Sequence, residues 1–252
     1  MKRINTLAFA LLAISLAGCA TQGNKDPLEG LNRGVYKFNK AADEAIIKPV
    51  AGAYKAVLPT PVRKGVNNFF SNLGDVVTTV NDLLQFKFDK AMSDGGRFVI
   101  NSTFGIAGIF DWASKDGIQK RDEDFGQTLA TWGWKDSTYL MLPILGPSTV
   151  RDTGGLVTDS WLFDPIGYAD PAVRNSLVVV KLIDRRAQYL PGSDLLDEAA
   201  LDPYIFMRDA YMQRRESQIM DGNDSKMQHD DSAENEDAAP TDKTAETTDT
   251  AK

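Results

Sequence analysis

The sequence predicts an all-α fold, a mostly helical body with one short exception. Apolar residues recur at steps of three and four along several stretches, which is the spacing of one face of an amphipathic helix. The dipeptide Asp-Pro occurs at 26–27, 164–165, 170–171 and 202–203, and Asp caps a helix start while Pro suits the first helical position. Strand-like composition is confined to residues 128–142.

Two helices are expected in the first third of the chain, separated by a turn at Pro59 and Pro61. Apolar residues at helical spacing follow Asp26 and indicate one amphipathic helix, which Pro49 is expected to end. Residues 62–86 repeat the spacing, and Asn, Asp and Thr fill much of the remaining positions.

The stretch 97–113 is unusually apolar and leaves three interpretations open. It is a buried core helix, an interfacial helix in contact with lipid, or a transmembrane span. Its 17 residues, with Arg97 at the head and Asp111 inside, are marginal for crossing a bilayer. Two further helices are predicted, at 172–188 and, more polar, at 203–216.

The region 128–142 is the exception to the helical pattern. Trp132, Gly133 and Trp134 lie between two β-prone stretches, 128–131 and 138–142. This order predicts a short hairpin or an ordered loop near residues 126–139.

Composition excludes several classes of function. The single His of the 252-residue chain, His229, lies in an acidic tail, so the body cannot form a His-based triad or an imidazole-rich metal site. Residues 217–252 hold ten Asp and Glu against three Lys, which leaves residues 19–216 nearly neutral. A neutral body without a basic block argues against a nucleic-acid partner. With no nucleotide, nucleophile-elbow or CxxC motif, we expect no catalytic residue, no metal and no cofactor.

The N-terminus resembles a bacterial lipoprotein signal. Lys2 and Arg3 precede a short apolar region that ends in Leu-Ala-Gly-Cys at Cys19. We expect cleavage before Cys19 and lipidation of its thiol, the alternative being an ordinary secretory signal with an incidental Cys. Ala20, rather than Asp, implies sorting to the outer membrane in lipoproteins. The expected divisions are a signal peptide (1–18), a lipidated linker (19–25), a helical domain (26–216) and an acidic disordered tail (217–252).

Ordered blocks of residues across 26–215 resemble the MlaA (VacJ) lipoprotein family. The opening block is DPLEGLNR followed by Phe38-Asn39, and the densest blocks are FGQTL, Trp132-Gly133 and LP to GPSTVRD. The signature residues that we take from these blocks are Asp26, Pro27, Leu28, Glu29, Asn32, Arg33, Asn39, Gly126, Pro143, Gly146, Pro147, Arg151 and Asp152.

The resemblance implies a ring-like, membrane-apposed bundle of helices around an amphipathic channel. Such proteins remove misplaced phospholipids from the outer leaflet of the outer membrane and maintain its lipid asymmetry. The implied partners are phospholipids, a trimeric porin and a soluble periplasmic lipid carrier. The implied location is the periplasmic face of the outer membrane, anchored through Cys19.

By the same resemblance, Gly126–Tyr139 matches a loop that borders the channel. Our hypothesis is that the residues lining or gating the passage are Leu129, Trp132, Gly133, Trp134 and Tyr139. Two rivals remain open. One is a porin-organising scaffold that transports no lipid, and the other is a phospholipid hydrolase, against which the absence of a His in the body counts.

Overall fold

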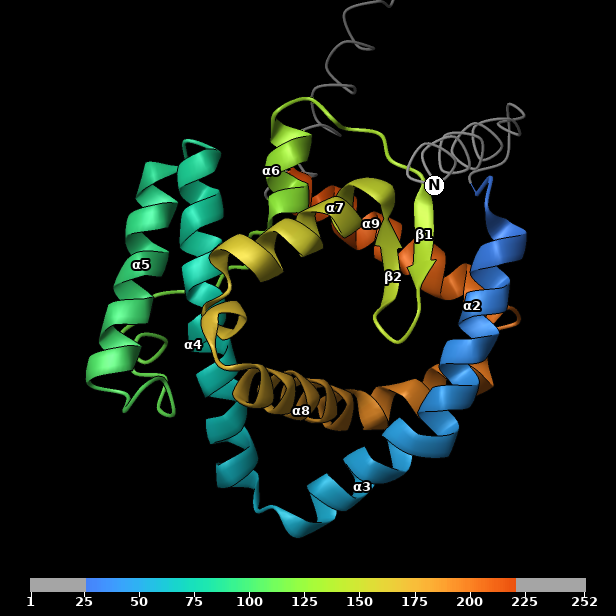
Figure 1. Ribbon diagram of the computed structural model, residues 1–252, viewed down its shortest axis with the longest axis horizontal. Helices are drawn as coiled ribbons and strands as arrows, with labels where there is room; N and C mark the ends of the chain where they lie inside the picture. Colours follow the sequence, from blue (N-terminus) through green and yellow to red (C-terminus); the bar gives the residue numbers. More distant parts are fainter. Residues whose placement is uncertain (1–25, 221–252) are drawn as a thin grey trace, which may run out of the picture. The chain divides into compact units, whose positions relative to one another are not determined.

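The structure is a computed structural model that describes residues 26–220, excepting the side chains of 193–199 (Figure 1). The predicted signal peptide, Cys19 and most of the acidic tail lie outside the described residues. The chain divides into two compact units between Met212 and Gln213, and the contacts described below lie within the first unit.

The N-terminal helix is longer than predicted, because Pro49 does not end it. Helix α2 (Glu29–Ala42) continues through a π-helical segment, η1 (Asp43–Ile47), into α3 (Lys48–Val57). The Lys48 N–H bonds to the Asp43 carbonyl, five residues back, and Pro49 then lies in the first turn of α3. Proline has no backbone N–H, and in the first turn of a helix that N–H would have no helical partner. The helix therefore continues through Pro49 without a break.

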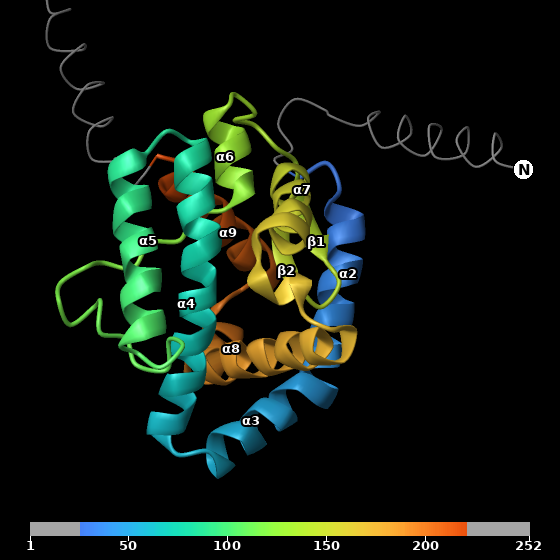
Figure 2. The same ribbon diagram turned by 60° about the vertical axis from the view of Figure 1, so that its left-hand side comes forward.

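The next two helices, α4 (Thr60–Leu84) and α5 (Phe88–Thr103), pack along each other as a helical hairpin (Figures 1 and 2). The prediction of helix up to residue 113 is wrong. Ile106, Ala107 and Gly108 all have positive φ angles, of 52°, 55° and 89°, which no right-handed helix accommodates. In the part of the chain that the structure describes, no helix combines the length and apolarity needed to cross a bilayer.

The region predicted as a hairpin or loop is a helix followed by an ordered loop. Residues 128–131 belong to α6 (Phe125–Thr131), because the Asp124 side chain caps it by accepting from the Gln127 N–H at 3.0 Å. The strand prediction for 128–131 is therefore wrong. The hairpin lies later, where β1 (Tyr139–Leu142) pairs antiparallel with β2 (Gly146–Thr149).

The C-terminal part confirms the predicted helices and the role of Asp-Pro. After the hairpin come α7 (Val150–Thr158), the π-helical η2 (Asp159–Phe163), the 3-10 helix η3 (Pro165–Tyr168), α8 (Pro171–Ala199) and α9 (Pro203–Ile219). Asp164 accepts from the Ile166 N–H at 2.9 Å, and Asp202 accepts from the Tyr204 N–H at 3.0 Å. Each aspartate thus caps the helix that its following proline begins.

Contacts between these elements form a closed circuit, which can be followed in Figure 1. In order, the contacting elements are α2, η1, α3, α8, α4, α6, α7, β2 and β1, which packs back on α2. Helix α5 packs against α4 as a branch of this circuit (Figure 2). The prediction of a mostly helical, ring-like fold is confirmed.

Candidate functional site

The candidate site is the exposed loop 132–138 between α6 and β1. The Trp132 indole N–H donates to the Leu84 carbonyl at the end of α4, at 3.1 Å, and its ring meets Phe125 edge-on at 5.7 Å. Trp134, with 46% of its surface exposed, follows Gly133, whose φ of 115° turns the chain outward. The loop therefore presents two indole rings at the surface, while the Trp132 contact attaches its first residue to the end of α4.

The predicted gate residues separate into two groups. Leu129 is half-buried on α6, and Trp132, Gly133 and Trp134 follow it in the exposed loop. Tyr139 is elsewhere: it is 1% exposed and packs with Met141 and Tyr204 in the apolar core cluster. Burial raises the pKa of its hydroxyl well above the usual range. Tyr139 therefore contributes to the packing of the core, and its assignment to the passage stays a prediction.

The loop is held from below by the start of α7. The buried Arg151 guanidinium donates from Nη1 to the carbonyls of Trp134 (3.2 Å) and Lys135 (2.9 Å). The Arg151 N–H donates to Ser137 Oγ at 2.9 Å, and the Val150 N–H donates to the Thr138 carbonyl at 3.0 Å. Four hydrogen bonds thus connect the loop to the first two residues of α7.

The signature residues of α2 attach this helix to β1. Asn32, which is fully buried, donates to the Tyr139 carbonyl (3.2 Å) and accepts from the Met141 N–H (2.9 Å). Asn39, two turns later, donates to the Leu142 carbonyl and accepts from the Ile144 N–H, both at 2.8 Å. The two side-chain amides are here called the asparagine clamp. They bond backbone groups along the edge of β1 that a neighbouring strand would otherwise bond.

A second set of signature residues joins Asp26 and the start of α9 to this clamp. Buried Asp26 accepts from Asn32 Nδ2 at 3.0 Å and from the Tyr204 hydroxyl. Arg33 forms a bidentate pair with Asp202, at 2.7 and 3.3 Å, and the guanidinium holds the pKa of Asp202 below its usual range. These contacts tie α2 to the start of α9.

The remaining signature residues have turn and packing roles. Gly126 meets Gly155 of α7, where an added Cβ would lie 2.4 Å from the Gly126 nitrogen. Gly146 has a φ of 88° at the start of β2, a conformation that favours glycine. The others are placed as follows: Pro27 and Leu28 precede α2, Glu29 pairs with Arg33 at 2.7 Å, Pro143 follows β1, Pro147 faces Met141, and Asp152 pairs with Arg151 at 2.8 Å.

The sequence did not predict a buried ionic network between α4, α5 and the segment that follows. Arg97, 1% exposed, lies 3.6 Å from Asp75 and 3.2 Å from Asp111. Asp75 also pairs with Lys120, and burial raises the pKa of its carboxyl. Two turns after Asp75 on α4, burial and the neighbouring Asp94 and Glu123 carboxyls raise the pKa of Asp82 to about 7. The polar positions noted in 62–86 were the available signal.

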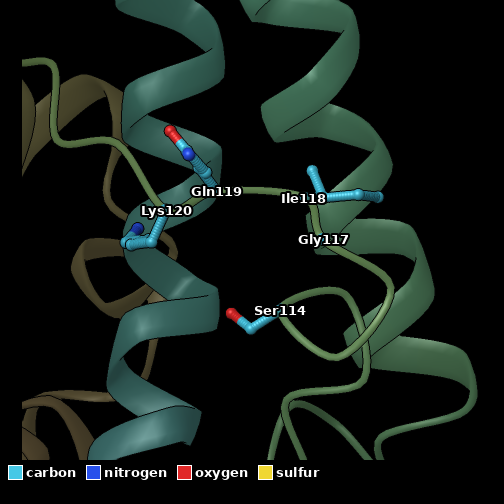
Figure 3. A pocket seen from close by; sticks show the side chains of 5 residues that line it. All are labelled: Ser114, Gly117, Ile118, Gln119 and Lys120. Carbon is cyan, nitrogen blue, oxygen red and sulfur yellow. The ribbon is translucent and has the colours of Figure 1, made fainter.

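A shallow cavity of about 530 Å³ adjoins this network (Figure 3). Its lining comes from the segment that crosses from α5 to α4, and consists of Ser114, Gly117, Ile118, Gln119 and Lys120. Lys120 is already engaged with Asp75 and, at 3.7 Å, Asp122. The cavity contains none of the predicted gate residues.

The exposed surface carries many large apolar side chains. Phe104 and Trp161 are 75% and 77% exposed. Others that are exposed include Phe86, Phe88, Met92, Ile106, Phe110, Trp112, Leu162 and Tyr168. By contrast, Asp, Asn, Arg and Gln side chains supply many of the fully buried residues. This distribution is the reverse of that expected for a protein surrounded by water.

Fold and surface together define a class: a mostly helical protein with a polar interior and an extensive apolar exterior. The family model described as MlaA lipoprotein matches residues 24–218, and the chain belongs to this family.

Relatives cover most of the chain. An uncharacterized protein of Rickettsia typhi is 37% identical over 196 residues, which are 77% of this chain and 78% of the relative. The intermembrane phospholipid transport system lipoprotein MlaA of Escherichia coli (strain K12) is 35% identical over 247 residues, or 92% and 95% of the two chains. A solved structure described as the structural basis for maintenance of bacterial outer membrane lipid asymmetry is 35% identical, with a TM-score of 0.69, and the match covers 77% of this chain and 98% of that one.

Proposed function

We propose that this chain is a lipoprotein of an intermembrane phospholipid transport system and maintains the lipid asymmetry of the outer membrane. It removes phospholipids that have strayed into the outer leaflet and passes them to a soluble periplasmic carrier. Family membership supports this function. The structural observation that carries it is the apolar exterior around a polar interior.

That distribution suits a protein held in a lipid leaflet. Each large apolar side chain left in water costs about 1.5–3 kcal/mol relative to burial. If acyl chains surround exposed side chains such as Phe104 and Trp161, this cost is removed. A phospholipid headgroup, in turn, meets a large desolvation cost in hydrocarbon, which a polar path through the protein lowers. Acyl chains stay in the bilayer during such a passage.

Anchoring is a further part of the proposal. Cleavage before Cys19 and lipidation of its thiol attach the chain to the outer membrane, with Ala20 favouring that destination. Residues 20–25 can extend about 20 Å, which keeps the helical domain at the bilayer. The domain divisions 1–18, 19–25, 26–216 and 217–252 and a trimeric porin partner belong to this proposal as well.

The loop 132–138 is proposed to border the lipid passage. Leu129, Trp132, Gly133 and Trp134 bring apolar surface and a glycine turn to one exposed place. An indole ring has an apolar body and a polar N–H, and is therefore suited to the boundary between acyl chains and headgroups. No step in this scheme needs a catalytic residue or a cofactor in this chain.

The test is surface-exposed phospholipid in a strain that lacks the protein, measured with a membrane-impermeant headgroup label. Wild-type protein should abolish the accumulation, whereas Trp134→Asp should not, because a carboxylate would have to lose its hydration beside the acyl chains. Trp134→Phe is the matched control, because it keeps an apolar ring at the same position, and it should act as wild type. Full activity of Trp134→Asp would remove the loop from the passage. Failure to crosslink lipid near Trp134 would favour the scaffold interpretation.

A further inference from the structure

Arg151 has a contact set that packing alone does not require. The side chain is 2% exposed, lies on the first turn of α7, and runs beneath the loop 132–138. One nitrogen, Nη1, donates to the carbonyls of Trp134 and Lys135, at 3.2 and 2.9 Å. The other two, Nε and Nη2, donate to Asp152 Oδ1 at 2.9 and 2.8 Å.

A guanidinium is needed to make all these contacts together. Its donors are fixed in a plane and point in different directions, so one side chain can bond a carboxylate on one edge and two carbonyls on the other. The three donors of a lysine ammonium radiate from one atom and cannot span that distance. The charge alone is therefore insufficient, and the shape of Arg151 is what fixes the loop.

The same contacts continue to the last helix. Asp152 Oδ2 accepts from the Tyr211 hydroxyl at 2.9 Å, and Tyr211 lies on α9. The Tyr211 ring also meets Tyr139, at the start of β1, with centroids 6.2 Å apart. The chain of contacts thus runs from α9 through Asp152 and Arg151 to the backbone of the loop.

The loop is exposed in its side chains but held in its backbone. The side chains of Trp132, Trp134 and Lys135 are exposed, while two of the loop's carbonyls are bonded to a buried cation. Such a segment keeps one backbone position while an exposed side chain such as Trp134 remains accessible to a substrate.

We propose that Arg151, Asp152 and Tyr211 form a latch that sets the position of the loop 132–138 and links it to α9. Arg151 is a positioning residue: it touches the loop's backbone and not the lipid. This inference rests on the proposed function, since the latch matters to transport because the loop borders the lipid passage.

The first experiment measures hydrogen exchange in peptides covering 132–138 of the purified full-length protein. Arg151→Gln and Arg151→Lys should both raise the exchange rate of this segment about tenfold or more, because both release the loop carbonyls. Tyr211→Phe removes one hydroxyl and should raise it by a smaller factor. The matched control is Arg186→Gln, which breaks a different bidentate pair, with Asp43, at 2.7 Å.

The control separates a latch from general destabilisation. Arg186→Gln should lower the melting temperature and leave exchange in 132–138 unchanged. Wild-type exchange in Arg151→Lys would overturn the latch, and so would an equal increase in Arg186→Gln.

A second measurement connects the latch to transport and keeps the two proposals distinguishable. In the strain lacking the protein, Arg151→Lys should leave surface phospholipid at least several-fold above the wild-type level, at equal protein abundance. Full restoration of asymmetry by Arg151→Lys despite a loosened loop would refute the positioning role. Failure of the wild-type protein itself to restore asymmetry would refute the proposed function, while the exchange data would still decide the latch.

Discussion

Replacing Asn32 with alanine should destabilise the folded chain by about 3 kcal/mol. The side chain is fully buried and serves three partners: Asp26 Oδ1 at 3.0 Å, the Tyr139 carbonyl at 3.2 Å and the Met141 N–H at 2.9 Å. Alanine leaves all three without this partner in a place that water does not reach. Each buried polar group left unsatisfied costs about 1–3 kcal/mol, and partial relaxation keeps the sum near the lower end of the possible range.

Asn39 is the matched control, because it makes the same two backbone contacts in a more exposed place. It bonds the Leu142 carbonyl and the Ile144 N–H, both at 2.8 Å, but water can replace it. Asn39→Ala should therefore cost about 1 kcal/mol or less. Asn32→Asp should be at least as damaging as alanine, since it loses both donors and adds a carboxylate beside Asp26.

The assay is denaturant-induced unfolding of the purified protein, followed by tryptophan fluorescence. Equal midpoints and slopes for Asn32→Ala and Asn39→Ala would refute the reasoning, because burial would then not decide the cost. A loss below about 1 kcal/mol for Asn32→Ala would refute it as well.

Three further predictions concern close packing, pH and anchoring. Gly155→Ala should destabilise the protein by about 2 kcal/mol or more, because the new Cβ would lie 2.4 Å from the Gly126 nitrogen. Gly154→Ala is the control: its Cβ would have nothing within 4 Å, so it should be neutral or slightly stabilising. Equal melting temperatures for the two variants would contradict this packing. The pKa of Asp82 is raised to about 7 in the folded state, so between pH 4 and 7 the folded chain binds a proton that the unfolded chain has released. The free energy of unfolding should therefore fall by roughly 2–4 kcal/mol as pH rises from 4 to 7. Asp82→Asn should remove this pH dependence from the unfolding curves, and an unchanged dependence would point to another group. Cys19→Ser should leave the circular dichroism of the body unchanged but release the protein from membrane fractions, and retention would indicate direct insertion of the apolar surface instead.

Local signals in the sequence predicted elements well where one pattern acted alone. The spacing in 62–86 corresponds to α4, and the Asp-Pro pairs at 164 and 202 begin helices as expected. Pro49 misled because a proline ends a helix only if the preceding turn needs its N–H, and the π-turn at η1 does not. Residues 128–131 misled because an N-terminal cap, Asp124, outweighed the β propensity of two threonines.

The sequence predicted an ordered loop at this place in the chain, but not the contacts that hold the loop. Trp132 and Trp134 are exposed on one loop, whereas Tyr139 is buried in the core, and a gating role for these residues stays a prediction. The contacts of Arg151 with loop carbonyls 16 and 17 residues away depend on tertiary placement, which periodicity does not encode. The buried pairing of Asp75 with Arg97 is of the same kind, since charged residues at such positions ordinarily indicate a solvated face.

The asparagine clamp has a consequence for the order in which the chain folds. It joins α2 to residues 107 positions later, and Arg33 joins the same helix to Asp202, 169 positions later. A chain is made from its N-terminus, so α2 exists long before either partner, and contacts of such long range form slowly. The apolar faces of the first helices therefore stay exposed until nearly the whole helical domain has been synthesised. Closure of the circuit is therefore a late event, because α8 is the last of its elements to be made, and a chain truncated before α8 (Pro171–Ala199) is expected to remain open and prone to aggregate.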